Sequence, residues 1–142
     1  MSVLDDGVAA FLDDVPVGVL STARDDGTPR QSVVYFTRDG DTIQISTESK
    51  RAKARDVART GRASLCVVGP ARPFPSVTVE GRASIRREHI GEPTARVVGR
   101  ITGQPPPEPQ SDDALAAADR VILEVKVERV YGASYLPAAG AP

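Results

Sequence analysis

The chain has 142 residues, a length typical of one domain and sufficient for a buried core. Its 18 Lys and Arg residues nearly balance its 19 Asp and Glu residues, and the formal net charge is −1. The molecule as a whole therefore lacks the positive field that draws proteins to nucleic acids or membrane surfaces. A single cysteine excludes an intrachain disulfide. Because the chain also has only one histidine, we predict no metal site.

No apolar run approaches the roughly 20 residues that a membrane-spanning helix needs. The first residues are acidic, and they lack the basic segment and the long apolar segment of a signal peptide. We therefore expect a cytoplasmic protein whose partners include neither a membrane nor a nucleic acid.

The first predicted element is a helix over residues 2–14, in which apolar residues recur at helical spacing. Ser2 is its candidate N-cap, and Pro16 prevents it from continuing. Three strands follow, at residues 17–22, 30–38 and 42–47. Asp-Gly pairs lie in the turns that join them. Because these connections are short, the three strands should be antiparallel neighbours.

A cationic helix is predicted over residues 50–60, and Gly61 is its natural C-terminal stop. At 100° per residue its buried face comprises Ala54, Val57 and Ala58. Two more strands are predicted beyond it, at residues 62–68 and 76–85. A loop with three prolines separates these two strands. Gly81 indicates a bend or bulge in the second of them, as a barrel strand requires.

Residues 87–101 are predicted to be helical in part, with interruptions at Gly91 and Pro93. The segment 103–112 is rich in proline and indicates a surface loop. The remaining expected elements are a helical turn at 114–118, a last strand at 121–130 and a frayed tail at 136–142.

Six strands with short turns, and one helix inserted after the third strand, predict a mainly β fold with accessory helices. We expect a closed or nearly closed antiparallel barrel, formed by residues 1–142 as a single domain. The sequence contains no glycine-rich phosphate-binding motif. It also contains no recognisable Ser–His–Asp or Cys–His arrangement, so no residue is assigned as a nucleophile.

The most informative stretch comprises residues 43–57, where a strand that ends in hydroxyl groups runs into a helix rich in Lys and Arg. Ser46 and Thr47 supply the hydroxyls. Free backbone N–H groups, the positive end of the helix and the ammonium groups would face one point. This arrangement predicts a site for an anion.

Each cation of this helix could either lie on a solvated surface or bind an anion. Arg51, Arg55 and Arg59 recur at every fourth position, which is typical of a solvated basic face and also suits a ligand. Lys53 borders the buried face. Its ammonium group either extends past the apolar surface to water or meets an anion.

The run from residue 19 to residue 68 resembles the flavin and deazaflavin oxidoreductase superfamily, which has the split barrel of the pyridoxamine 5′-phosphate oxidase type. Within it, the sequence is most similar to the branch that uses coenzyme F-420, a deazaflavin. The segments that carry the resemblance are 20–22, 45–47, 51–55, 63–67, 79–83 and 128–132. The resemblance covers the chain except for residues from about 91 to 118.

The resemblance implies a homodimeric, six-stranded FMN-binding split barrel with two cofactors in grooves between the subunits. The implied activity is hydride transfer between reduced coenzyme F-420 and an electron-poor small molecule of the enone, quinone or tetrapyrrole type. Two alternatives stay open. One is an FMN-dependent oxidase or reductase, and the other is a non-catalytic flavin- or deazaflavin-binding protein.

The same resemblance implies the site residues, position by position. Strand residues that lie along the cofactor ring are Gln31, Ser32, Val33 and Val34. Residues at the phosphate end and the tail are Ser46, Thr47, Lys50, Arg51, Lys53 and Arg55. The loop with Pro73 and Phe74, and the region of Tyr131, approach from the partner subunit.

Two further residues carry hypotheses. Tyr35 is either a proton donor or a strand aromatic whose hydroxyl group lies at the rim. Asp56 stands where relatives often have Asn. Its carboxylate could pair with the neighbouring cations of the helix and weaken phosphate binding.

Overall fold

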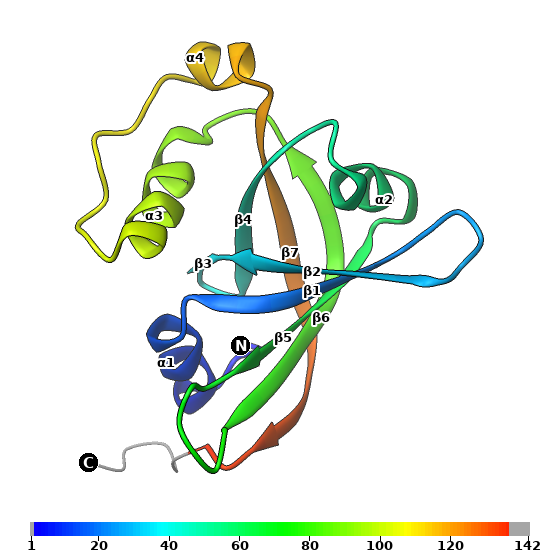
Figure 1. Cartoon of the computed structure of the whole chain (residues 1–142), viewed down its shortest axis with the longest axis vertical. Coiled ribbons are helices and arrows are strands. Elements are labelled where there is room, and N and C mark those ends of the chain that lie inside the picture. Colours follow the sequence, from blue (N-terminus) through cyan, green and yellow to red (C-terminus); the bar gives the residue numbers. More distant parts are fainter. Residues whose placement is uncertain (1, 137–142) are drawn as a thin grey trace.

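A computed structural model describes residues 2–136 of the chain. It contains a curled antiparallel sheet of seven strands with helices around it (Figure 1). In chain order the elements are α1 (Asp6–Asp14), β1 (Val17–Ala23), β2 (Pro29–Tyr35), β3 (Thr37–Asp39), β4 (Thr42–Glu48), α2 (Ala52–Thr60), β5 (Arg62–Val68), β6 (Ser76–Arg86), α3 (Gly91–Thr102), α4 (Asp112–Ala117) and β7 (Arg120–Ser134).

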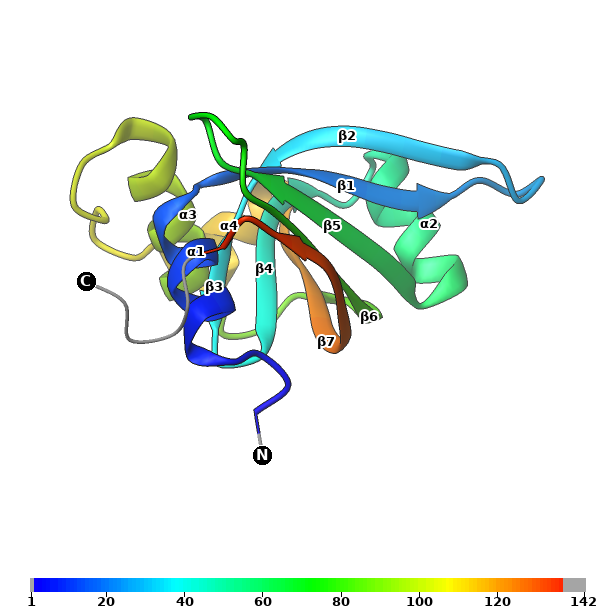
Figure 2. The same cartoon turned by 90° about the horizontal axis from the view of Figure 1, so that it is seen from below.

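The strand order in the sheet is β2-β1-β5-β6-β7-β4-β3. β2 and β3 are consecutive in the chain, yet they lie at opposite edges of this order, so the sheet must curl back on itself. Figure 2 shows the curl, with β2 above and β4 and β7 below. The predicted mainly β split barrel with accessory helices is thereby confirmed.

The strand count of six was wrong, because the predicted strand 30–38 is two strands. Residues 29–35 pair with β1, whereas residues 37–39 pair with β4. Phe36 lies between them with its side chain fully buried, and its N–H donates to the carbonyl of Pro16 at 3.2 Å. The apolar pattern runs on through this point, so the sequence carried no sign that the strand changes partner.

The core lies inside the curl, where alternate strand residues point inward. Leu20, Leu65, Val79 and Leu123 are each almost completely buried there, and α1 adds Leu12. Each such side chain contributes about 1.5–3 kcal/mol by leaving water. The predicted irregularity at Gly81 is confirmed, since the pairing with β7 shifts register between Glu80 and Gly81.

Both predicted N-terminal boundaries of the early helices were too early. α1 begins at Asp6, and the carboxylate of Asp5 caps it by accepting from the N–H of Val8 at 2.8 Å. The hydroxyl of Ser2, the predicted cap, instead donates to Asp41 at 2.6 Å. α2 begins at Ala52 rather than at Lys50.

One residue of the predicted buried face of α2 was also wrong. Ala54 and Val57 are buried as expected, but Ala58 is exposed and the charged Asp56 is buried in its place. A helical wheel ranks residues by hydropathy, so it assigns a carboxylate to the solvent side. The tertiary structure supplies partners for this carboxylate.

The excursion between β6 and β7 contains a continuous helix, α3, where interruptions were expected. Gly91 and Pro93 fall in its first turn, where backbone N–H groups have no partner within the helix and proline costs little. In the predicted surface loop 103–112, residues 103–110 are all exposed, and α4 begins at Asp112. α4 is capped by Ser111, and β7 extends to Ser134. The predicted frayed tail lies outside the described residues except for Leu136.

Among the described residues, no helix is both long enough and apolar enough to cross a membrane.

Candidate functional site

A groove of about 540 Å³ lies between the barrel and the excursion that carries α3 and α4. Its barrel side is formed by β2, β4, α2 and the start of β7. Its lining comprises Val33, Val34, Tyr35, Ser46, Lys53, Thr94, Val97, Val98, Ile101, Gln110, Leu115, Ala118 and Arg120. None of these lining residues is acidic, and two are cations. The groove therefore offers an apolar surface with a local positive charge.

β2 gives the groove a backbone edge. In the described part of the chain β2 pairs with β1 alone, so the N–H and C=O groups of its other edge have no sheet partner. Val33 and Tyr35 project from this strand and are 72% and 37% exposed. An exposed valine beside free backbone donors and acceptors is the surface that a flat heterocycle needs.

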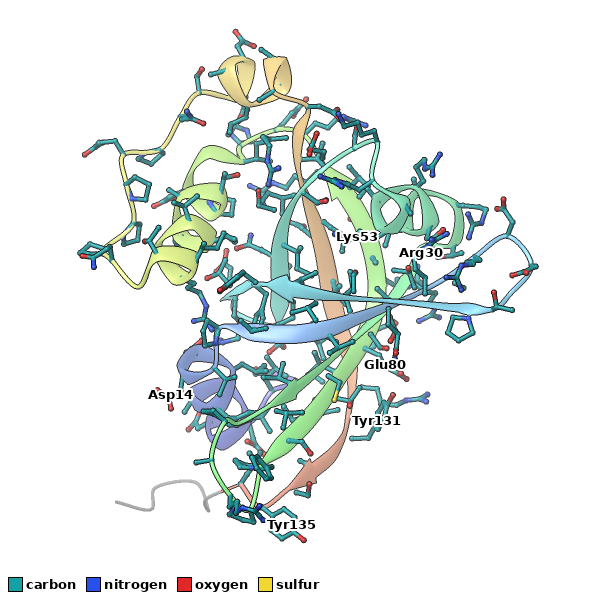
Figure 3. All side chains as sticks on the ribbon, viewed as in Figure 1. Asp14, Arg30, Lys53, Glu80, Tyr131 and Tyr135 are labelled. Carbon is teal, nitrogen blue, oxygen red and sulfur yellow. The ribbon has the colours of Figure 1, made fainter. Side chains whose placement is uncertain are left out.

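Lys53 is the second residue of α2 and reaches toward the groove. Figure 3 shows it between α2 and β2. Partial burial lowers the pKa of its ammonium group, and the nearby charges of Arg51 and Arg120 lower it further. The ammonium is thus held among like charges, and within residues 2–136 it forms no ion pair. An anion at this point would relieve the repulsion.

Arg120 is a second cation of the groove, and it comes from the other end of the sequence. The register of β4 with β7 places it opposite Glu48, close to Ser46. One guanidinium N–H₂ group donates to the hydroxyl of Ser46 at 2.7 Å. Within the described residues no carboxylate lies at ion-pair distance from Arg120, so its remaining donors are free for a ligand.

The turn between β4 and α2 is held by Asp119, the residue before Arg120. The carboxylate of Asp119 accepts from the hydroxyl of Ser49 and from the N–H of Lys50, the latter at 3.2 Å. Its backbone carbonyl accepts from the N–H of Ser49 at 3.1 Å. The start of β7 therefore fixes the loop that leads into α2.

The other predicted phosphate contacts are not in the groove. Lys50 and Arg51 are exposed, and both pair with Glu48, at 3.1 and 3.2 Å. Arg55 lies on another flank of α2, in a separate recess that it shares with Arg30 and Arg59. Thr47 is buried, because it alternates with Ser46 and faces the core.

Only the second half of the predicted ring-binding strand lies at the groove. Val33 and Val34 line the groove, together with Tyr35. Gln31 is exposed and donates to the hydroxyl of Ser21 at 3.3 Å, and Ser32 is half-buried. Neither Gln31 nor Ser32 lines the groove of this single chain.

Pro73 and Phe74 lie in the loop between β5 and β6, at the end of the molecule opposite α4 (Figure 1). Phe74 is exposed, and the guanidinium of Arg72 lies over its ring at 5.7 Å. Tyr131 lies on β7 near Glu80 (Figure 3). Desolvation and the charge of Glu80 raise the pKa of its phenol. Contacts of these residues with a partner's cofactor stay a prediction.

Of the cations of α2, Asp56 pairs with Arg59, and not with Lys53 or Arg55. It is 3% exposed, and it accepts from the hydroxyl of Thr22 and from Nε of Arg30, both at 2.8 Å. Arg59 approaches its other oxygen at 3.4 Å. Burial alone would raise the pKa of Asp56, but the hydrogen bonds and the charge of Arg30 lower it overall. The carboxylate therefore fastens α2 to β1 and β2.

The excursion contributes the far wall of the groove through α3. Thr94, Val97, Val98 and Ile101 follow the i, i+3, i+4, i+7 pattern of one helix face. Two arginines hold this helix against the barrel. Arg96 donates to the buried amide oxygen of Gln44 at 2.7 Å. Arg100 donates to the carbonyls of Leu12 and Asp13 at 2.9 and 2.8 Å.

Sequence reasoning missed Arg120 and the α3 wall. The helical spacing of Thr94, Val97, Val98 and Ile101 was a usable signal, although Gly91 and Pro93 obscured it. Arg120 had none, because its neighbour Ser46 is 74 residues away in the chain. Only the pairing of β4 with β7 brings them together.

The chain matches a known protein family over most of its length. Residues 4–134 match the family described as pyridoxamine 5′-phosphate oxidase. The chain belongs to the pyridoxamine 5′-phosphate oxidase family. It is also 31% identical, over 137 residues, to a biliverdin reductase of Mycobacterium tuberculosis (strain CDC 1551 / Oshkosh) that depends on reduced coenzyme F-420. That alignment covers 94% of this chain and 90% of the relative.

Solved structures with a similar fold have different names. A coenzyme F-420 reductase superposes with a TM-score of 0.72 at 27% identity, over 90% of this chain and 98% of the other. A haem-storage protein of Vibrio cholerae superposes with a TM-score of 0.66 at 16% identity, over 92% and 94% of the two chains. The second likeness concerns the fold alone.

Proposed function

We propose that this protein is an oxidoreductase that uses coenzyme F-420 and passes a hydride to an electron-poor small molecule. The observation that carries the proposal is the groove, in which Lys53 and an unpaired strand edge meet an apolar surface without any acidic residue. The phosphodiester and oligoglutamate tail of this cofactor are anionic, and its ring is flat, so the residues present fit it. The likeness to an F-420-dependent reductase supports the same choice.

The chain's own residues bind and orient the cofactor in this proposal. Lys53 holds the phosphate, and Ser46 lies beside it. The free edge of β2 offers hydrogen bonds to the ring, while Val33 and Val34 form its apolar wall. When bound, the reduced deazaflavin supplies a hydride to the substrate's electron-poor double bond. The protein contributes position and the exclusion of water by α3. Tyr35 lies at the groove and remains a candidate proton donor.

The alternative is an FMN-dependent enzyme. FMN ends in a phosphate monoester that Lys53 would hold in the same way, and the family match is to an oxidase family rather than to an F-420 enzyme. A protein that binds the cofactor without catalysis is the third candidate.

The proposal includes a homodimer. A second, apolar recess of about 450 Å³ lies over β1 and β5 and is lined by Val17, Val19, Cys66 and Val68, among others. Val33 lines this recess as well as the groove. A second copy that covered the apolar recess would therefore also approach the mouth of the cofactor groove.

The test is a parallel titration of the purified protein with coenzyme F-420 and with FMN, followed by cofactor fluorescence. We expect tighter binding of coenzyme F-420, and we expect Lys53→Ala to weaken it about tenfold through the loss of a charge-assisted contact. Lys126→Ala is the matched control, because this lysine is exposed on β7 away from the groove.

Each other outcome has a meaning. Tighter binding of FMN would favour the FMN-dependent alternative. Binding of either cofactor without reduction of any enone, quinone or tetrapyrrole would favour a non-catalytic role. A folded dimer that bound neither would contradict the proposal. Unchanged affinity in Lys53→Ala would remove Lys53 from the site.

A further inference from the structure

The groove has two chemically different ends. Ile90 at the start of α3 packs against Leu115 of α4 and Ile122 of β7, which places the first turn of α3 beside the start of β7. The last turn of α3 lies at α1 and Phe36, because Arg100 contacts both. One end of the groove therefore holds Arg120, and the other end holds Ile101.

The wall between these ends is apolar. Val97 and Val98 line the groove between Thr94 and Ile101, and Val98 and Ile101 are among the exposed large apolar residues of the molecule. Thr94 and Ile101 are seven positions apart in the helix, which corresponds to about 10 Å. A small acceptor would leave most of this wall in water.

The end beside β7 is built for a negative or hydrogen-bonding group. Arg120 has no acidic partner within the described residues, and Ser46 holds its guanidinium in place at 2.7 Å. Nearby in the first turn of α3, the hydroxyl of Thr94 is buried and makes no hydrogen bond in the described part of the chain. Guanidinium and hydroxyl donors together suit a carboxylate.

We infer that α3 and Arg120 form the acceptor side of the groove, and that the substrate is an extended, conjugated, mainly apolar molecule with a carboxylate at one end. The apolar body lies along Val98 and Ile101, and the carboxylate binds Arg120. This inference rests on the proposed function, because it leaves Lys53 and the β2 edge to the cofactor. It assigns specificity to α3, which lies outside the sheet, and to Arg120 at the start of β7.

The experiment measures binding, so it does not depend on turnover. The probes are a chalcone with a carboxylate on one ring, the methyl ester of that chalcone, and cyclohexenone. Each is titrated into the dimer loaded with its oxidised cofactor, and again into the protein alone. We expect the carboxylate probe to bind most tightly and cyclohexenone least tightly.

Two substitutions separate the two ends. Arg120→Gln should weaken the carboxylate probe about tenfold and leave the ester unchanged, because only the acid makes the charged contact. Ile101→Ser should weaken the acid and the ester by the same factor, about five- to tenfold, through lost apolar contact. Arg82→Gln and Val3→Ser are the matched controls, since both residues are exposed and do not line the groove.

The outcomes are distinguishable from failure of the proposed function. Every variant is also titrated with the cofactor. We expect unchanged cofactor affinity in Ile101→Ser and in the controls. For Arg120→Gln we expect a smaller loss of cofactor affinity than of affinity for the carboxylate probe, because Arg120 lies near Lys53 and Ser46. An Arg120→Gln protein that lost cofactor affinity and kept its preference for acid over ester would overturn the inference and give Arg120 to the cofactor. Equal binding of all three probes to wild type would overturn it as well. Loss of cofactor binding by wild type would instead refute the proposed function.

Discussion

At the scale of single residues, Asp56 shows how a charged side chain can be buried in this fold. Three donors from two strands and its own helix surround it, so its charge is compensated. Without these partners a buried carboxylate would be costly. The residue therefore stabilises the position of α2, on which Lys53 depends.

Asp56→Ala should lower the free energy of unfolding by about 3 kcal/mol, because Arg30 loses its buried partner. Urea denaturation would measure this loss of stability, with Glu108→Ala in the exposed loop as control.

The pKa of Asp56 is lower in the folded protein than in the unfolded chain. Its stabilisation is therefore complete above about pH 4 and is lost as the pH falls through the lowered pKa. Asp56→Asn should flatten the loss of stability in that acid range, and an unchanged profile would contradict this.

Lys53 leads to a second pH prediction, for binding. Its pKa is lowered in the free protein, and a bound anion favours the protonated ammonium. Affinity for the anionic cofactor should therefore fall as the pH rises through the lowered pKa. Lys53→Arg keeps its charge throughout this range, so its affinity should stay constant there. Fluorescence titrations across the alkaline range would measure both proteins. Parallel profiles would show that Lys53 does not bind the anion.

At the scale of elements, α1 and α3 stabilise each other. α1 has no basic residue in its last turn, so its C-terminal carbonyls have no cation of their own. Arg100 of α3 supplies one, and its guanidinium also lies over the ring of Phe36 at 5.1 Å. The far wall of the groove is thereby fixed to the N-terminal part of the chain.

Arg100→Ala should reduce stability by about 2 kcal/mol, through two lost charged hydrogen bonds. It should also raise the mobility of α3, and faster amide exchange in α3 and the last turn of α1 would show this. Arg82→Ala is the control, because its ion pair with Glu128 lies on the surface. Exchange that stayed unchanged in both helices would mean that Arg96 alone holds α3.

At the scale of the whole molecule, the groove and the apolar recess adjoin at Val33, which lines both. The apolar recess exposes hydrophobic side chains to water, and the groove opens beside β2, the strand that carries Val33. A second copy of the chain would cover the apolar recess and would also lie beside the groove, since a two-fold contact repeats each feature on both partners. Dimerisation and cofactor binding should therefore be coupled.

Val68→Lys tests this coupling, because Val68 lines the apolar recess and is 48% exposed. A charge there should convert the dimer into a monomer and weaken cofactor binding at the same time. Val3→Lys, at a similarly exposed valine outside the recess, should change neither. Light scattering gives the mass. A monomeric wild type, or a Val68→Lys dimer with normal affinity, would contradict the prediction.

Much of the barrel could be predicted because its signals are local. Alternation of apolar residues marked most of the strands, Asp-Gly pairs marked the early turns, and Gly81 marked the bulge. The break at Phe36 could not be predicted, because it depends on a strand leaving β1 for β4. In the candidate site, Ser46 and Lys53 come from one continuous stretch and both line the groove, whereas Thr47 from the same stretch is buried.

The sequence by itself determined the class of fold, the cationic helix start and the absence of a recognisable nucleophile motif, since each follows from neighbouring residues. The tertiary structure decided which cations meet. Lys50 and Arg51 form ion pairs with Glu48, and Arg55 lies outside the groove in a separate recess. Arg120, which is distant in the sequence, lies in the groove beside Ser46. Whether a cation forms an ion pair or lines the groove depends on which groups lie next to it in space, and the curl of the sheet determines those neighbours.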